Sequence, residues 1–176
     1  MAAAQPAVMD VRRVDYADPG DARALVLLLD GYARDVAGGG QPLADEVLKG
    51  LPAALQQRPQ AFSVIAWAQE PGAQAGALPV PVGLVNCLEG FSTFACRPLV
   101  NVHDVVVAPA WRGQRIAQRM LALVESIARE RGACKLTLEV LSGNASAMQL
   151  YLREGFGPYA LDPAMGQAVF LQKPLG

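Results

Sequence analysis

The stretch that decides the fold covers residues 99–141 and reads LVNVHDVVV (99–107), APAWRGQR (108–115), IAQRMLALVESIARERG (116–132), AC (133–134) and KLTLEVL (135–141). The β-branched content of the first segment predicts a buried strand, which Pro109 ends. Apolar residues recur at helical spacing in the third segment, and Gly132 stands where a helix end favours a left-handed residue. The last segment alternates and predicts another strand. Together they predict a parallel pair joined by a helix, with its first turn at the sheet edge where α/β proteins bind ligands.

The flanking sequence predicts further elements on both sides of this unit. Strands are expected at 8–14, 61–68, 80–88 and 169–172, helices at 19–35 and 43–57 and from Ser142 or Asn144 to Arg153, and irregular segments at 70–79 and 90–98. This order implies the α/β fold class, with a central mixed β-sheet and helices on both faces. A chain of 176 residues with 52% hydrophobic content suits a single domain, so we expect one domain over residues 1–176.

Composition narrows the partners and the compartment. Lys and Arg number 15 against 16 Asp and Glu, which argues against binding to nucleic acid or to an acidic membrane and favours small-molecule partners. Three cysteines without a CxxC pair, and a start that reads MAAAQP, argue against export and predict a cytoplasmic location. The longest apolar runs fall far short of the ~20 residues that span a bilayer.

The single histidine, His103, limits the possible chemistry. No Cys/His cluster has metal-ligand spacing, so we assign no metal. A Ser-His-Asp or Cys-His hydrolase is disfavoured as well, because no nucleophile elbow is recognisable.

The turn at 107–117, VAPAWRGQRIA, feeds directly into the amphipathic helix. Backbone N–H groups at a helix start lack partners and the dipole there favours negative charge, so this turn suits a pyrophosphate. The alternative is an ordinary strand-to-helix turn with two solvated arginines.

This turn resembles the cofactor motif of the GNAT acyltransferases, Gln/Arg-x-x-Gly-x-Gly/Ala, which stands here as RGQRIA over 112–117. Arg115 replaces the motif's first Gly. A cation at a helix N-terminus is unfavourable by ~0.3–1 kcal/mol unless an anion lies there, so we interpret Arg115 as a phosphate partner. The resemblance implies that acetyl-CoA, as cosubstrate, is bound by Val105, Val106, Val107, Arg112, Gly113, Gln114, Arg115, Ile116, Ala117, Gln118, Asn144 and Tyr151.

A second segment, NASAMQLYLREGF over 144–156, resembles the superfamily pattern Asn-x-x-Ala-x-x-Leu-Tyr-x-x-x-Gly-Phe. Spacings of three and four place Asn144 and Tyr151 along one helix face. By resemblance, Asn144 binds the pantetheine region and Tyr151 protonates the departing thiolate. The alternative for Tyr151 is a core aromatic with a satisfied hydroxyl.

Amine acylation also needs donors for an oxyanion and a group that removes the amine's proton. In the family the donors are main-chain N–H groups, which correspond here to residues 105–107. His103 is the favoured base because an imidazole accepts a proton near neutral pH; the alternative is a structural imidazole in the sheet. Asp104 and Glu139 are weaker candidates, since strand alternation places Asp104 on the opposite face from His103. The alternative for each acid is an ion pair with an arginine.

Residues 89–98 resemble loosely the segment that precedes this strand in the diamine acetyltransferase branch. This similarity gives Phe91 and Phe94 as residues that flank the acceptor pocket and Glu89 as one that attracts a cation. Asp104 is also expected to bind the substrate. The alternative for the two phenylalanines is a hydrophobic loop plug. Cys96 is interpreted as a small buried apolar residue.

The resemblance predicts a GNAT N-acetyltransferase with a cofactor-binding core at 99–156. It would transfer an acetyl group from acetyl-CoA to a primary amine of a small molecule by direct attack, and it would pair as a homodimer. The alternatives are a protein or peptide N-acetyltransferase and a non-catalytic CoA-binding regulatory domain. The sequence does not identify the acceptor amine.

Overall fold

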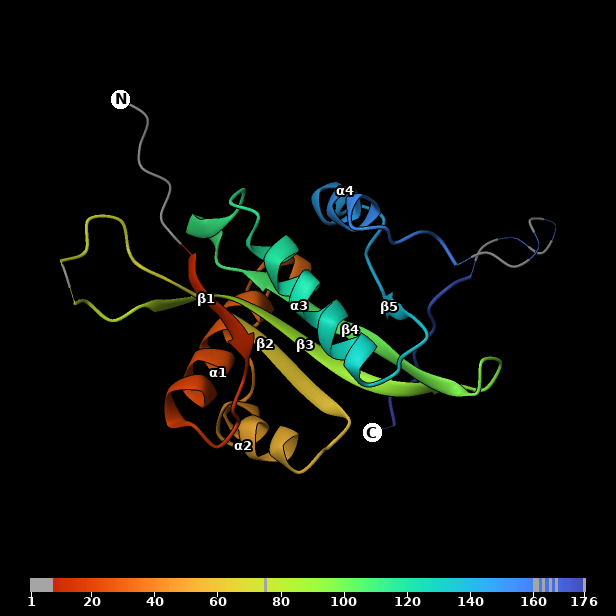
Figure 1. The fold of residues 1–176 in the computed structure, drawn as a ribbon, viewed down its shortest axis with the longest axis horizontal. Coiled ribbons are helices and arrows are strands. Elements are labelled where there is room, and N and C mark those ends of the chain that lie inside the picture. Colours follow the sequence, from red (N-terminus) through yellow and green to blue (C-terminus); the bar gives the residue numbers. More distant parts are fainter. Residues whose placement is uncertain are drawn as a thin grey trace. The chain divides into compact units, whose positions relative to one another are not determined.

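The computed structural model describes residues 8–74, 76–159, 162, 164, 166 and 168–175. The chain divides into two compact units, Met1–Leu138 and Glu139–Gly176. In chain order (Figure 1), the first unit contains β1 (Val8–Arg13), α1 (Pro19–Ala33), η1 (Val36–Gly38), α2 (Asp45–Gln56), β2 (Ala61–Ala68), β3 (Val80–Ser92), β4 (Arg97–Val107), η2 (Pro109–Trp111), α3 (Ile116–Glu130) and β5 (Leu136–Leu138). The second unit contains α4 (Ala145–Arg153).

The first unit is built on a five-stranded sheet with the order β1-β2-β3-β4-β5. Neighbouring strands are antiparallel except β4 and β5, which are parallel and joined through α3. The predicted mixed sheet with its crossover helix is therefore confirmed.

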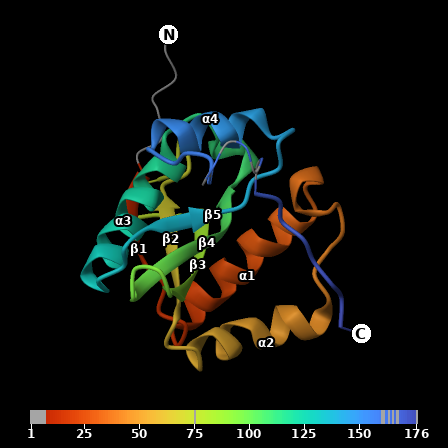
Figure 2. The ribbon, with the colours of Figure 1, turned by 90° about the vertical axis from the view of Figure 1, so that its right-hand side faces the viewer.

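Helices cover both faces of this sheet (Figure 2). On one face Ile65, Leu84 and Val106 are cross-strand partners and pack with Leu25 and Leu28 of α1 in one buried cluster. On the other face a Cβ atom at Gly83 would come within 2.7 Å of the Met120 Cε atom of α3. Because successive strand residues point to opposite faces, α1 and α3 lie on opposite sides of the sheet.

An ion pair between Arg12 and the buried Asp21 ties β1 to the start of α1. The Arg12 guanidinium donates two hydrogen bonds of 2.6 Å to the carboxylate of Asp21, whose side chain is fully buried. Asp18 caps the helix by accepting from the Asp21 amide at 2.8 Å, and Pro19 fits the first turn because that turn needs no N–H from it.

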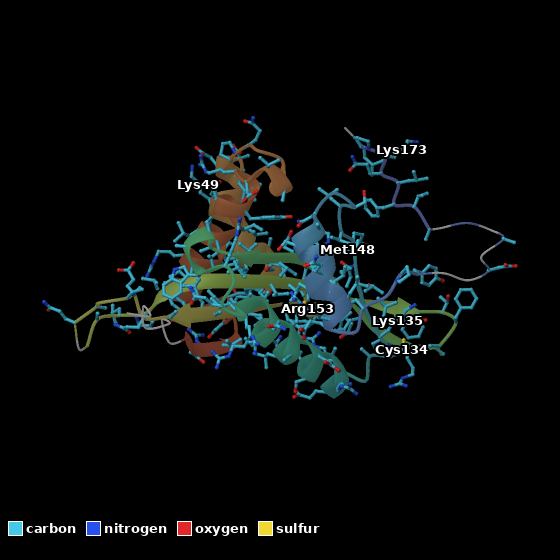
Figure 3. The ribbon with its side chains drawn as sticks, turned by 90° about the horizontal axis from the view of Figure 1, so that it is seen from above. Lys49, Cys134, Lys135, Met148, Arg153 and Lys173 are labelled. Carbon is cyan, nitrogen blue, oxygen red and sulfur yellow. The ribbon has the colours of Figure 1, made fainter. Side chains whose placement is uncertain are left out.

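The prediction of an irregular segment at 90–98 is wrong, because β3 and β4 continue into these residues and form a hairpin. Phe91 pairs with Pro98 and Ser92 with Arg97, which leaves a four-residue turn at 93–96. The start of β5 contacts this hairpin, since the Cys134 amide donates to the Pro98 carbonyl at 2.7 Å (Figure 3). Phe91 has a high strand propensity, and the ladder that pairs Gly90 with Leu99 continues through it.

The prediction of a last strand at 169–172 is also wrong. A strand needs a neighbour for its backbone hydrogen bonds, and none of the described strands pairs with this segment. Its apolar side chains accordingly stay exposed, by 75%, 74% and 83% at Val169, Phe170 and Leu171.

Among the helices of the described ranges, none has the length and apolar character that a bilayer crossing requires.

Candidate active site

A β-bulge interrupts β4 where the sequence analysis expects its reactive side chains. On β3, Asn86 pairs with Asp104 while the next residue, Cys87, pairs with Val102, so His103 is an extra residue on β4. A bulge of this kind redirects side chains and is over-represented beside active sites.

The bulge brings His103 and Asp104 to the same face of the sheet. Asn101 pairs with Leu88 and Asp104 with Asn86, and these two partners on β3 are two residues apart, hence on one face. The His103 Nδ1 atom lies 3.3 Å from Asn101 Oδ1, which places the imidazole there as well. The expectation that Asp104 lies opposite His103 is therefore wrong, because strict alternation fails at the extra residue.

A row of polar side chains crosses this face and ends on Asp104. The Tyr16 hydroxyl lies 2.8 Å from Ser63 Oγ, the Ser63 hydroxyl donates to Asn86 Oδ1 at 2.6 Å, and Asn86 Nδ2 donates to Asp104 Oδ2 at 3.0 Å. Ser63 is buried, whereas the other three residues are partly exposed. Neither sequence motif predicts this row. Its only signal in the sequence is a single polar residue within each of two otherwise apolar strands, AFSVIAWA and VGLVNCL.

Two tyrosines that border this face have raised pKa values. Burial is the main cause for Tyr16, and its hydrogen bond to Ser63 acts in the opposite direction. Burial also dominates for Tyr32 of α1, and the negative charge of Asp104 adds to it. Tyr32 therefore lies within electrostatic reach of Asp104.

The second half of β4 has an open edge. Pairing with β5 covers only Val100–Val102 of β4, and none of the described strands pairs with residues 103–107 on that side. In an antiparallel ladder every second residue pair exchanges hydrogen bonds. The Ala108 amide donates to the Val82 carbonyl, so counting in steps of two from Ala108 identifies the residues of β4 that bond to β3. By that alternation Val106 bonds to β3, whereas the main-chain groups of Val105 and Val107 point to the open side.

The predicted cofactor turn is fastened to its surroundings by Arg112. Its Nη2 atom lies 2.9 Å from Asp35 Oδ2, and its Nε atom donates to the Val107 carbonyl at 3.2 Å. The hydrogen bond from Arg112 is the largest cause of the lowered pKa of Asp35. The turn is thus braced against the loop that follows α1.

Arg115 is the N-cap residue of α3 and has φ 58° and ψ 22°, a left-handed conformation. This is the position where the family motif has Gly, and the backbone keeps the conformation that Gly favours. No side chain caps α3, so its first N–H groups are left for solvent or an anion. A Cβ atom added at Gly113, which has φ 79°, would meet no other atom within 4 Å, so the approach to the turn is open.

The remaining predicted residues of the turn point in different directions. Ile116 is buried and packs beneath Gly83, while Ala117 and Gln118 are partly exposed. The Gln114 Oε1 atom is buried and has no hydrogen-bond partner within the part of the chain that the structure describes. A buried oxygen of this kind is suited to a donor from a bound ligand.

The predicted substrate residues of the hairpin are not brought to Asp104. Glu89 lies on the α3 face, where its Oε2 atom is 3.0 Å from Arg131 Nη1. Phe91 is 60% exposed and Phe94 is fully exposed at the hairpin turn, so neither forms a buried plug. Cys96 is exposed too, and the expectation that it is buried is wrong.

In the second unit, Asn144 and Tyr151 lie on α4, along which Figure 3 labels Met148 and Arg153. The Asn144 side chain accepts from the Ala147 amide at 3.1 Å, which confirms the predicted N-cap. The Tyr151 ring packs edge-on against Phe156 with centroids 5.8 Å apart. A separation of seven residues keeps Asn144 and Tyr151 on one face of the helix.

The model of the acetyltransferase (GNAT) family matches residues 42–156, which is more than half of the chain and includes parts of both units. The chain belongs to the GNAT acetyltransferase family. The resemblance seen in the two sequence motifs is thereby confirmed.

This GNAT protein is similar to two curated relatives over parts of their length. It is 38% identical over 91 residues to a streptothricin acetyltransferase of Streptomyces lavendulae, covering 50% of this chain and 48% of the relative. It is 35% identical over 81 residues to a thialysine N-epsilon-acetyltransferase of Mus musculus, covering 46% of each. The chain thus spans about half the length of the curated relatives it matches.

A solved structure supports the fold over nearly the whole chain. An aminoglycoside N-acetyltransferase in complex with CoA superposes with a TM-score of 0.66 at 16% identity, covering 96% of this chain and 95% of that one. This likeness concerns the fold.

The GNAT fold implies acetyl-CoA, and the residues of this chain fit that group. The open edge of β4 offers main-chain groups to an extended chain, as an added strand would use them. The uncapped start of α3 suits a diphosphate. Within the described ranges, no group of three or more His, Cys, Asp or Glu residues could hold a metal ion.

Proposed function

We propose that this chain is an N-acetyltransferase that transfers an acetyl group from acetyl-CoA to a primary amine of a small molecule by direct attack. One observation carries the proposal: the open edge of β4 at Val105 and Val107 leads directly into the uncapped start of α3. A main-chain edge followed by an anion-binding helix start matches a ligand with an extended arm and a diphosphate.

Binding of the cosubstrate is assigned to the turn at the start of α3 and to the open edge of β4. The turn residues 112–118 hold the diphosphate, with Arg115 supplying a charge and Gly113 leaving room for close approach. Val105 and Val107 bond the pantetheine arm through the main chain, and Val106 supports them from the core. Asn144 is assigned to the pantetheine arm by the family motif that it belongs to. When bound, acetyl-CoA supplies the thioester that an amine can attack.

The chain's own groups handle the protons and the charge. His103 removes the proton from the amine, and main-chain N–H groups of β4 on its open side stabilise the oxyanion. Tyr151 is assigned by the family motif as the group that protonates the departing thiolate. Asp104, on the same face as His103, attracts the ammonium form of the acceptor.

The acceptor class follows from the partly exposed acid on that face, Asp104, and from the relatives. A small primary amine, such as a polyamine, an amino sugar or an amino acid, fits a site with one carboxylate and one imidazole. Relatives named for thialysine and streptothricin support a small molecule over a peptide.

The proposal extends to the organisation of the protein. We assign residues 1–176 to one acetyltransferase domain with its cofactor core at 99–156, since the family match crosses the boundary between the two units. A cytoplasmic location and a homodimer are part of the proposal. Analytical ultracentrifugation tests the homodimer, and a monomer at micromolar concentration contradicts it.

A thiol-release assay tests the activity. Acetyl-CoA is mixed with the full chain and with a panel of diamines, amino sugars, amino acids and peptides, and free CoA is followed over time. The expected result is turnover with at least one small amine that falls in His103→Ala. If only peptides react, the small-molecule assignment is wrong. If calorimetry detects CoA but no acceptor reacts even in a single turnover, the chain is a CoA-binding domain without activity.

A further inference from the structure

The hydrogen-bonded row on the α1 face ends on Asp104, an acid that has no cationic partner among the residues that the structure describes. We propose that Asn86, Ser63 and Tyr16 are positioning residues that hold the Asp104 carboxylate as the recognition group for an ammonium on the acceptor. This inference rests on the proposed function, because it names how that site selects its amine.

The direction of each bond in the row is fixed by its chemistry. An ionised carboxylate only accepts, so the Asn86 amide donates its Nδ2 hydrogen to Asp104. Asn86 Oδ1 must then accept, and the Ser63 hydroxyl is its donor at 2.6 Å. With that hydrogen committed, Ser63 Oγ accepts from the Tyr16 hydroxyl. Every donor points toward Asp104, and bonds aligned in this way polarise one another.

The backbone holds the row in place. Ser63 is the cross-strand partner of Asn86, and Asn86 is the partner of Asp104, so the ladder of β2, β3 and β4 sets their spacing. The Ser63 side chain is 1% exposed, so water cannot compete for its hydrogen bonds. The bulge at His103 is what places Asp104 on this face.

Among the described residues of the first unit, Asp104 differs from the other buried and partly buried acids in having no cationic partner. The acids that do have one form the pairs Arg12–Asp21, Arg34–Asp30, Arg112–Asp35 and Arg131–Glu89. Within the described ranges, Asp104 has no ion pair, and its Oδ1 atom accepts no hydrogen bond. A half-buried carboxylate left in this state is costly unless a charge pairs with it, and an ammonium ligand would offset that cost.

The row orients Asp104 and does not conduct protons. An amide lies between Ser63 and Asp104, and an amide passes no proton along a chain of hydrogen bonds under ordinary conditions. The role of Asn86 is therefore to fix the carboxylate and to support its negative charge. His103 remains the group that exchanges a proton with the amine.

The test compares charged and uncharged acceptors in three variants of the full chain. The charged probes are 1,4-diaminobutane and n-butylamine, and the uncharged probe at neutral pH is O-methylhydroxylamine. A hydrogen bond to a charged group predicts a rise of about 10- to 50-fold in KM or Kd for the charged probes in Asn86→Leu. We expect about 3- to 10-fold in Ser63→Ala and about 2- to 3-fold in Tyr16→Phe, since their support is indirect.

Three controls separate positioning from a general loss of structure. Val64→Ala changes a buried neighbour on the opposite face and should lower stability without changing KM for the charged probes. The KM for the uncharged probe and the Kd for acetyl-CoA should stay within about twofold in all variants. Ser63→Thr keeps the hydroxyl and should restore most of the affinity lost in Ser63→Ala.

Failure of this inference is distinguishable from failure of the proposed function. If the wild type releases no CoA with any amine, calorimetry with 1,4-diaminobutane still measures cation binding, and the three variants must weaken it. Equal losses for charged and uncharged probes, unchanged KM in Asn86→Leu, or no detectable binding of either charged probe to the wild type would overturn the inference while acetyl transfer stood.

Discussion

The two halves of β4 are both rich in valine, but they differ in strand pairing and in the exposure of their side chains. Just before the bulge, Val100–Val102 are paired on both sides, with β3 and β5, and Val100 and Val102 are 0% and 2% exposed. The half from His103 to Val107 is paired with β3 alone and exposes its imidazole. One extra residue thus separates a core strand from a candidate site, and substitutions should affect stability in the first half and chemistry in the second.

Replacing His103 gives the largest expected change and is confined to chemistry. Loss of a general base lowers kcat about 10²- to 10⁴-fold in His103→Ala, while an exposed side chain changes the free energy of unfolding by less than about 0.5 kcal/mol. Steady-state rates across pH, with urea unfolding of both proteins, measure the two effects. An unchanged pH–rate profile in the variant would contradict the base assignment.

A pair of proline substitutions tests the open edge directly. Val105→Pro removes an N–H that points away from β3, so the protein should fold but lose about 10²- to 10³-fold in kcat through a missing oxyanion donor. Val106→Pro removes a ladder bond to β3 and should prevent folding. Circular dichroism and the thiol-release assay compare them. Equal damage in the two variants would show that both edges of β4 are in use.

Val100→Ala tests the stability of β4 before the bulge. Two buried methyl groups and the cavity they leave predict a loss of about 2–3 kcal/mol, or about 4–12 °C in Tm. Catalysis per folded molecule should not change. Val105→Ala is the matched control, because this partly exposed side chain should cost less than half as much. A large fall in kcat for Val100→Ala would mean that the halves are not separable.

Arg115→Gly has a smaller effect with two opposite components. Relief of the left-handed backbone should stabilise the fold by about 1 kcal/mol, and loss of the cation should weaken CoA binding about three- to tenfold. Thermal unfolding and calorimetric titration measure the two separately. Unchanged or tighter CoA binding would remove the phosphate role of Arg115.

The smallest effect concerns Cys87, which opposes Val102 in the doubly paired half. Burial raises the pKa of its thiol to about 12 from 9.0. A raised pKa favours the neutral thiol in the fold, so its contribution to stability is complete below pH 9.0 and is lost as the pH approaches 12. At about pH 8.5, iodoacetamide should label exposed Cys96 and spare Cys87. Rapid labelling of Cys87 under native conditions, measured by mass spectrometry, would contradict its burial.

Much of the fold could be predicted from local patterns. The strand at Ala61–Ala68, the crossover helix and the cap at Asn144 follow from periodicity and capping signals that lie within one segment. The prediction of a strand at 169–172 is wrong for a different reason. Apolar content indicates that a segment can form a strand, but it does not show that another strand is available to pair with it.

The candidate site could be predicted only in part, because its decisive feature involves two strands. Two motifs gave the cofactor turn and Tyr151. The bulge at His103 depends on register against β3, which no pattern within residues 99–107 contains. The row through Ser63 and Asn86 depends on the same register, so each residue looks like an isolated polar substitution in its own strand.

The bulge also constrains which length changes this gene can tolerate. Deleting the codon for His103, the extra residue, would restore an unbroken ladder and leave Val100 and Val102 opposite Glu89 and Cys87, so both side chains should stay buried. This one-codon deletion should therefore pass a selection for solubility and fail a selection for acetyl transfer. A deletion scan along the strand under both selections would measure the difference.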